Sequence, residues 1–451
     1  MSFKNILSSI NQENLLSYWG QLNASEKEHL LSQINRLDVD RFKIQQNLLK
    51  QPIPLQTSKI EPFSDFALSG NAVDKAAGKE LIAKGLLGCL IIAGGQGSRL
   101  GFDGPKGVFP VSPIKHKSLF QLFAEKTDAA GRQAGRLLNL AIMTSPQNHV
   151  ETIAFFEKNH YFGLAHSQIS FFSQGMLPLL DQQGNLFLES PSAIAEGPDG
   201  NGSSLEHFYR SGIWKDWIDK GIRYLNFVVV DNPLADPFDA ELVGHLHRCQ
   251  SEIAIKCTLR RDANEKVGVI AKQNDKVVVV EYSEISDDDR IAIGPGDTLK
   301  HSCANLSLFC FKMDFIKDIM GNHPTSLPLH KAFKAVKCID SQGKTVKSNE
   351  PMAWKFEQFI FDILPLSKRV TALVYPREEC FAPLKNFSGE DSIATVQSLM
   401  QKRDRHEFEE VTGCSCESAP FEVSQEFYYP TPVLLAKWKG KRAPTSGYAQ
   451  A

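Results

Sequence analysis

The chain has 451 residues, too many for one ordinary hydrophobic core, and this length predicts two or three domains. The 50 basic and 52 acidic residues leave a formal charge of −2, and no basic run with interleaved aromatic residues occurs, so we expect no nucleic-acid partner. No apolar stretch approaches the length of a membrane span, and the amino terminus lacks a signal-peptide core. We therefore expect a cytoplasmic protein without membrane contact, whose nine cysteines are reduced and mostly buried.

Residues 1–75 are predicted to form a helical amino-terminal region. Leucine and isoleucine recur at helical spacing between residues 12 and 50, and Ser25 with Glu28 fits a capping box before one of the helices. Residues 51–62 contain three prolines and few periodic apolar positions, which predicts an extended connector.

Residues 76–375 are predicted to form the main domain, of the α/β class. Short aliphatic runs alternate there with helical segments, which is typical of a central, mostly parallel or mixed sheet with helices on both faces. The expected strands are residues 86–92, 138–143, 169–172, 227–230 and 253–259, and the expected helices are residues 119–136, 150–159 and 202–220. Residues 267–270 and 276–282, split by Gln273, Asn274 and Asp275, predict a β-hairpin. Residues 376–451 are expected to form a small C-terminal region.

A glycine-rich segment follows the first predicted strand. Residues 93–101 have the sequence AGGQGSRLG, and Pro105, Lys106 and Gly107 follow shortly after. Glycines let a backbone turn successive N–H groups toward a polyphosphate, while Arg99 and Lys106 would supply positive charge. The position after a strand suits a ligand crevice at the carboxyl ends of a sheet.

Spacing excludes the two commoner phosphate loops. A Walker A loop ends in Gly-Lys-Ser/Thr, whereas Lys106 follows a proline and precedes a glycine. A dinucleotide fingerprint has two residues in its second gap, whereas Gly97 and Gly101 are separated by three. A plain tight turn between strand and helix is the alternative, but it leaves Arg99 and the proline before Lys106 unexplained.

The segment resembles the activation loop of the eukaryotic-type UDP-N-acetylhexosamine pyrophosphorylases, within the wider UDP-sugar pyrophosphorylase family. Matching motifs continue in order at residues 161–164 (YFGL), 171–178 (FFSQGMLP), 198–202 (PDGNG), 230–232 (VDN), 267–269 (VGV), 281–286 (EYSEIS) and 383–386 (PLKN). The resemblance implies a Rossmann-like, GT-A-like nucleotidyltransferase domain at residues 76–375. It also implies direct transfer, in which a sugar 1-phosphate oxygen attacks the α-phosphorus of UTP and pyrophosphate leaves.

The resemblance implies roles for the residues that match the motifs. Gln174 and Gly200 would recognise uracil, because a glutamine amide both donates and accepts and a glycine lets the ring lie close. A plain turn residue is the alternative for Gln174. The residues expected to bind the nucleotide are Ala93, Gly94, Gly95, Gly97, Lys106, Gln174, Gly200 and Asp231, and those expected to act in catalysis are Arg99, Lys106 and Lys355.

Asp231 follows the apolar run 227–230, so its carboxylate is expected at the carboxyl end of a strand. The resemblance implies that it binds Mg²⁺, a hard cation that suits carboxylate and phosphate oxygens. An N-cap or Asx-turn before Pro233 is the alternative. Lys355 matches a second phosphate-directed lysine, although Pro351-Met352-Ala353-Trp354 replaces the glycine-containing segment that usually precedes it. Without the resemblance, a single lysine beside aromatic residues is more often a solvated helix residue, and this is the alternative for Lys355.

Asn201, Gly268, Glu281 and Asn305 match the positions that hold the sugar. The family tends to have Asn-Ala-Gly-Asn at the last of these, whereas residues 302–305 are SCAN here. N-acetylglucosamine 1-phosphate is the expected substrate beside UTP. Glucose 1-phosphate or a broad set of sugar 1-phosphates is the alternative, since one extra group is often worth only about 1–3 kcal/mol. A catalytically silent sugar-nucleotide sensor is the non-enzyme alternative, and the sequence indicates no oligomeric state.

Overall fold

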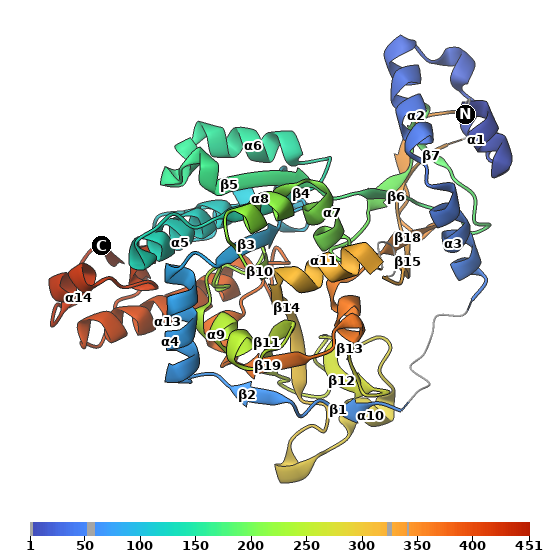
Figure 1. The fold of residues 1–451 in the computed structure, drawn as a ribbon. Coiled ribbons are helices and arrows are strands. Elements are labelled where there is room, and N and C mark those ends of the chain that lie inside the picture. The colour runs from blue at the N-terminus through green and yellow to red at the C-terminus, as the bar shows by residue number, and fades with distance from the viewer. Residues whose placement is uncertain (1–2, 52–58, 323–326, 341) are drawn as a thin grey trace. The chain divides into compact units, whose positions relative to one another are not determined.

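The computed structural model describes residues 3–51, 59–322, 327–340 and 342–451 (Figure 1). The chain divides into two units, each assembled from three separated stretches. The smaller unit comprises residues 1–57, 174–203 and 327–360, and the larger unit comprises residues 58–173, 204–326 and 361–451. The division into the consecutive regions 1–75, 76–375 and 376–451 stays a prediction. Most of the predicted connector, residues 52–58, lies outside the described residues.

A mixed sheet organises the larger unit, in the strand order β2-β19-β11-β14-β10-β3-β4-β5. The five predicted strands are confirmed as β3 (Leu87–Ile92), β4 (Leu140–Thr144), β5 (Ile169–Ser173), β10 (Tyr224–Val229) and β11 (Ile253–Leu259). β2 (Phe66–Leu68) and β19 (Val370–Val374) extend the parallel part, while β14 (Cys303–Lys312) runs antiparallel to both of its neighbours. The expected mostly parallel sheet is therefore confirmed.

The predicted hairpin is confirmed at the side of this sheet. β12 (Val269–Gln273) and β13 (Lys276–Val280) pair antiparallel, and β12 also pairs with β1 (Glu61–Pro62) and β14. Asn274 and Asp275 form the two-residue turn with φ values of 49° and 61°. Such left-handed turns match the twist of the two strands, and Asn and Asp tolerate them better than most residues.

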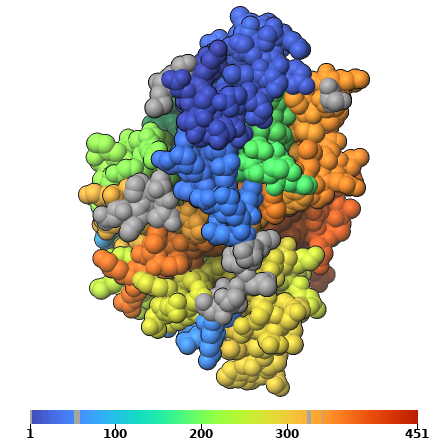
Figure 2. All heavy atoms as spheres, turned by 90° about the vertical axis from the view of Figure 1, so that its right-hand side faces the viewer, coloured from blue at the N-terminus to red at the C-terminus, as the bar shows by residue number. Residues whose placement is uncertain are grey.

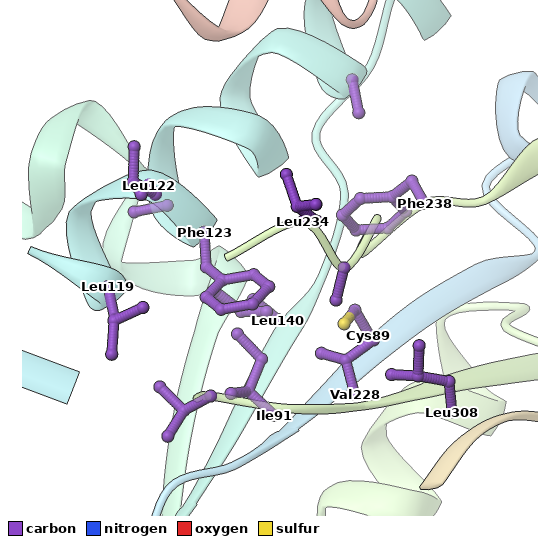
Figure 3. Packing of buried hydrophobic residues seen from close by; sticks show 14 of the residues in the cluster. Cys89, Ile91, Leu119, Leu122, Phe123, Leu140, Val228, Leu234, Phe238 and Leu308 are labelled. Atoms are coloured by element: carbon purple, nitrogen blue, oxygen red, sulfur yellow. The ribbon is translucent and has the colours of Figure 1, made fainter. Parts of the chain in front are cut away.

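Helices cover both faces of the sheet, as expected. Because side chains alternate along a strand, Cys89 and Ile91 of β3 pack into an aliphatic core with helices α4 (Ala72–Ala83), α5 (Leu119–Ala134) and α9 (Ala240–Arg248) (Figure 3). On the opposite face, a Cβ on Gly88 would lie 2.3 Å from the ring of Trp217, so the strand requires glycine there. The remaining helices of this part are α6 (His149–Lys158), α7 (Ser204–Arg210), α8 (Ile213–Asp219), α10 (Asp287–Ile291) and α11 (Met313–Asn322).

Two sequence expectations need correction. The helix expected at residues 202–220 is two helices, α7 and α8, because Gly212 adopts φ 84° and interrupts the hydrogen-bond ladder. The capping box of the second amino-terminal helix is formed by Asn23 and Glu26 rather than by Ser25 and Glu28. The pattern of the motif was right, but the helix begins two residues earlier.

The C-terminal part contains α12 (Arg377–Cys380), α13 (Ile393–Thr412), α14 (Pro432–Trp438) and the short parallel pair β20 (Glu422–Val423) and β21 (Tyr448–Ala449). Phe408, Phe421, Phe427 and Trp438 form a small aromatic core. The expectation of a small C-terminal region did not include the 20-residue helix α13.

The smaller unit contains α1 (Phe3–Ser9), α2 (Ala24–Arg36) and α3 (Val39–Leu49), which confirms the predicted amino-terminal helices. They share a core with Leu177, Leu180, Leu188 and Ile194, and Figure 2 shows the blue helices next to this green segment. The antiparallel pairs of this unit are β6 (Met176–Pro178) with β9 (Glu196–Pro198), β7 (Leu188–Ser190) with β8 (Ala193–Ile194), β15 (His330–Lys334) with β18 (Ala353–Glu357), and β16 (Lys337–Ile339) with β17 (Thr345–Lys347).

All nine cysteines are free, and six of them are buried. No described helix combines the length and the apolar character that crossing a membrane requires.

Candidate active site

The glycine-rich segment and Asp231 leave the same edge of the sheet. β3 and β10 are parallel neighbours, with Ile92 opposite Val229, and the N–H of Val230 donates to the carbonyl of Ile92 at 3.0 Å. The segments that follow the two strands therefore start side by side. This is the edge where ligands bind in open α/β sheets.

The glycine loop, residues 93–107, is closed on itself by backbone hydrogen bonds. The N–H of Gly97 donates to the carbonyl of Gly104 at 2.9 Å, and the N–H of Lys106 donates to the carbonyl of Gly95 at 3.1 Å. Gly95 and Arg99 are exposed, and a Cβ built on Gly95 would meet nothing within 4 Å. By contrast, a Cβ on Gly97 would lie 2.7 Å from the ring of Phe102. Packing thus requires Gly97, whereas Gly95 leaves its backbone open to a ligand.

Asn148 clamps this loop and was missed by the sequence reasoning. Its side chain is 1% exposed, and its amide nitrogen donates to the carbonyl of Ala93 at 3.1 Å and toward that of Gly95 at 3.4 Å. Its amide oxygen accepts from the N–H of Ser145, so the amide orientation is fixed. The sequence signal that could have identified Asn148 is its position as a polar residue between the predicted strand 138–143 and the predicted helix 150–159.

Lys106 and Asp231 come together at the sheet edge. The Lys106 ammonium lies 3.8 Å from a carboxylate oxygen of Asp231 and donates to the carbonyl of Leu384 at 3.3 Å. Their side chains are 17% and 20% exposed, so both are partly desolvated yet reachable. The Asx-turn that was the alternative for Asp231 is made by the next residue, Asn232, whose amide oxygen accepts from the N–H of Leu234.

Asn232 also holds the 380–384 segment against this edge. The fully buried amide donates to the carbonyl of Cys380 at 2.7 Å and accepts from the N–H of Ala382 at 2.9 Å. The N–H of Leu384 then donates to the backbone carbonyl of Asp231 at 2.8 Å. Asn232 therefore positions the carbonyl that Lys106 contacts.

The donor set around Asp231 fits a magnesium ion shared with a substrate. No group of three or more His, Cys, Asp or Glu side chains suited to a metal occurs among the described residues. Magnesium is commonly held by one or two carboxylates together with substrate phosphates and water, rather than by an all-protein cage. A single carboxylate beside a phosphate loop meets that requirement.

The structure brings Gly268, Glu281 and Asn305 together where β12, β13 and β14 meet. The N–H of Asn305 donates to the carbonyl of Gly268 at 2.8 Å, and a Cβ on Gly268 would lie 3.0 Å from a Glu281 carboxylate oxygen. Asn305 lies at a break in the β11–β14 register, and its amide oxygen accepts from the N–H of Ser307, which has φ 55°. The bulge explains part of the role of Asn305 without any ligand.

The other predicted residues lie in the smaller unit. Gly200 adopts φ 90°, and a Cβ there would lie 2.3 Å from the carbonyl oxygen of Gln358. The crossing chain alone therefore requires this glycine. Asn201 accepts through its amide oxygen from the N–H of Ile360 at 3.0 Å, and Gln174 is 7% exposed. Their contacts with uracil and sugar stay predictions.

Lys355 lies in strand β18, not in the helix that was its alternative setting. Its ammonium forms an ion pair with Glu357 at 2.8 Å, two residues along the same strand and hence on the same face. In the smaller unit Lys355 also packs near β9, since a Cβ on Gly197 would lie 3.1 Å from its Cε.

Known proteins resemble this chain over most of its length. "UDP-N-acetylglucosamine pyrophosphorylase" of Saccharomyces cerevisiae is 32% identical over an alignment 470 positions long, gaps included, which covers 98% of each chain. "UDP-N-acetylglucosamine diphosphorylase 2" of Arabidopsis thaliana is 31% identical, over 85% of this chain and 79% of its own. A crystal structure of the uridine diphosphate N-acetylglucosamine pyrophosphorylase of Trypanosoma brucei, 24% identical, superposes with a TM-score of 0.82 over 100% of this chain and 98% of that one, which shows a shared fold.

The family model described as UTP–glucose-1-phosphate uridylyltransferase matches residues 36–420. This range contains the glycine loop, Asp231 and every other residue of the candidate active site. The chain therefore belongs to the UTP–glucose-1-phosphate uridylyltransferase family.

Proposed function

We propose that this protein is a uridylyltransferase that forms UDP-N-acetylglucosamine and pyrophosphate from UTP and N-acetylglucosamine 1-phosphate. The observation that carries the proposal is the junction of an open glycine loop with Lys106 and Asp231 at the carboxyl edge of β3 and β10. Family membership supports the reaction type, and the two relatives named above support the sugar.

In the proposed reaction, an oxygen of the sugar 1-phosphate forms a bond to the α-phosphorus of UTP. The bond between that phosphorus and the bridging oxygen to the β-phosphate breaks, and the electron pair leaves with pyrophosphate. No protein nucleophile is needed, so the protein contributes positioning and charge neutralisation. The exposed Arg99 and the Lys106 ammonium are the cations that the larger unit offers to the phosphates.

Magnesium, held by Asp231, would neutralise phosphate oxygens of UTP and of the leaving pyrophosphate. Lys106 lies 3.8 Å from the same carboxylate, so this one side chain would orient both a protein cation and a metal. The carbonyl of Leu384 accepts from Lys106 without neutralising its charge. The ammonium thus stays available to an anionic substrate.

We further propose that the residues of the smaller unit read the nucleoside. Gln174 and Gly200 would recognise uracil, and Lys355 would meet a phosphate after exchanging its partner Glu357. Asn201 of the smaller unit, and Gly268, Glu281 and Asn305 of the larger unit, would hold hydroxyl and acetamido groups of the sugar, because amides both donate and accept and a carboxylate accepts.

The proposal is tested by measuring steady-state pyrophosphate release from UTP, in the presence of Mg²⁺, with each sugar 1-phosphate in a separate assay. We expect kcat/KM for N-acetylglucosamine 1-phosphate to exceed that for glucose 1-phosphate by about tenfold or more, as one group in a pocket allows. A strong preference for glucose 1-phosphate would contradict the proposed sugar substrate but would leave the proposed reaction type unchanged. Binding of UDP-N-acetylglucosamine without any pyrophosphate release would instead indicate a sensor.

The nine free cysteines fit a reducing compartment, and we propose that the reaction takes place in the cytoplasm. Subcellular fractionation tests this location, and we expect the protein in the cytoplasmic fraction. Recovery only in an oxidising or membrane-bounded fraction would contradict the proposal.

A further inference from the structure

The larger unit contains a cavity of about 460 Å³ that no residue of the glycine loop lines. Residues of helices α4, α9 and α13 line it, together with residues 375–379 and 428–430, and we call it the α4–α13 cavity. Figure 1 labels the three helices. Its size falls within the range of about 300–1,000 Å³ that is usual for small-molecule sites.

Most acidic side chains that line this cavity already have partners within the protein. The ion pairs with Lys256 and Arg403 offset part of this negative charge, while hydrogen bonds from neutral groups stabilise other carboxylates without cancelling their charge. The contacts are those of Asp239 with Lys256, Asp236 with the hydroxyl of Tyr429, Glu241 with the N–H groups of Gly70 and Asn71, and Glu379 and Glu407 with Arg403.

Two basic side chains at the rim, unlike Lys256 and Arg403, lie outside these contacts. Lys75 and Lys79 are one turn apart on α4, and neither ammonium group has an ion pair or hydrogen bond with any residue that the structure describes. Both are exposed, so they can move toward a ligand. Two such ammonium groups on one helix face favour a ligand with more than one anionic oxygen.

Lys126 adds a third cation, deep in the wall. It is 3% exposed, and its ammonium donates to the carbonyls of Pro233 at 2.6 Å and Ala235 at 3.0 Å. An ammonium has three N–H donors, and the third has no acceptor within the described ranges. Burial lowers the pKa of Lys126 to about 8, so an anion in the cavity would favour its charged form.

Uncharged acceptors complete the lining. The amide nitrogen of Gln133 donates to the carbonyl of Pro430, which leaves its oxygen available, and the hydroxyl of Ser69 also lines the cavity. These groups are suited to hydroxyls rather than to an apolar body.

The cavity wall continues directly into the candidate active site. The 233–241 segment, whose carbonyls Lys126 holds, follows Asp231, and the 375–379 segment leads to Leu384. Asn232, between Asp231 and the 233–241 segment, binds Cys380 and Ala382, which directly follow the 375–379 segment. We propose that the α4–α13 cavity is a second ligand site, which binds a small phosphate ester carrying hydroxyl groups and is coupled to UTP binding.

Calorimetric titration with glucose 6-phosphate tests the binding without any need for catalysis. We expect saturable binding to the wild-type protein that is weakened about tenfold or more in Lys75→Ala/Lys79→Ala, because two charge-assisted contacts are lost. Both residues are exposed, so this variant should fold normally. Lys84→Ala, at the end of the same helix but outside the cavity, is the matched control and should bind like wild type.

Lys106→Ala distinguishes the cavity from the glycine loop and should keep the affinity for glucose 6-phosphate. Absence of saturable binding to the wild type would overturn the proposal. So would binding that Lys106→Ala abolishes and Lys75→Ala/Lys79→Ala preserves, since the phosphate would then occupy the glycine loop. Equal affinity for inorganic phosphate would overturn the recognition of hydroxyl groups.

The coupling is tested by repeating the titration with UTP and Mg²⁺ bound, and this arm rests on the proposed function. We expect the dissociation constant of glucose 6-phosphate to change about fivefold or more, in the range usual for linked sites. An unchanged constant with UTP demonstrably bound would overturn the coupling alone. A failure of UTP itself to bind would instead contradict the proposed reaction.

Discussion

Lys106 in the larger unit and Lys355 in the smaller one carry the same charge in contrasting settings. Lys106 follows a glycine loop, and its nearest carboxylate is 3.8 Å away. Lys355 lies within a strand and is already paired with Glu357 at 2.8 Å. The side chains are 17% and 26% exposed, so burial does not separate them. Lys106 is therefore available to an anion, whereas Lys355 must first exchange a partner.

The largest effect is therefore expected at Lys106. Lys106→Ala should lower kcat by about 10²-fold or more, consistent with roughly 3 kcal/mol for one lost charge-stabilising donor. Steady-state pyrophosphate release measures it, and circular dichroism checks the fold. Lys158→Ala, an exposed lysine on α6 of the same unit, serves as the control and should retain wild-type turnover.

Asp231→Asn should have the next largest effect. Removing the carboxylate takes away both the proposed metal ligand and the neighbour of Lys106, so we expect kcat to fall about 30-fold and the Mg²⁺ concentration for half-maximal rate to rise. A Mg²⁺ titration of the initial rate separates these effects. An unchanged Mg²⁺ requirement would remove Asp231 from the metal site.

Asn148→Asp probes how the glycine loop is held. The substitution replaces a donor with a carboxylate that faces the carbonyls of Ala93 and Gly95, so the loop should loosen. We expect kcat/KM for UTP to fall about tenfold, mostly through KM, since phosphate binding precedes the chemistry. Asn159→Asp, at the other end of α6, is the control. Equal losses in both variants would indicate a general effect on the helix rather than on the loop.

The smallest effects are expected around Lys355. Lys355→Ala should lower kcat/KM only about fivefold, because the lysine first gives up its pair with Glu357, and partly exposed pairs contribute little. Glu357→Gln frees the ammonium and should change kcat/KM by no more than about twofold. Kinetics that show a larger loss for Lys355→Ala than for Lys106→Ala would reverse the comparison between the two lysines.

The glycine loop was predictable because its signals are local. The apolar runs of β3 and β10 define the strands, and the residues that follow them must then emerge at one edge. Asn148 and Asn232 were not singled out, because their roles depend on carbonyls 55 and 148 residues away in the chain. Gly200 was singled out for uracil, but the distant backbone of Gln358, which also requires a glycine there, could not be foreseen.

Helix α13 shows why the C-terminal part resisted prediction. Many charged residues lie between its apolar ones. The apolar stripe that includes Val396, Met400 and Phe408 is therefore a weak helix signal in the sequence when its packing partners are not known. Those partners include Phe421 and Trp438, which lie beyond the helix and come near it only through tertiary folding. A single sequence gives no local sign of that contact.

The most direct test of the central claim is pyrophosphate release from UTP and N-acetylglucosamine 1-phosphate by the wild-type protein and by folded Lys106→Ala, measured side by side. We predict stoichiometric formation of pyrophosphate and UDP-N-acetylglucosamine by the wild type, and a rate lowered about 10²-fold or more in the variant. Near-wild-type turnover in the variant, or no pyrophosphate from the wild type with any sugar 1-phosphate, would contradict the account.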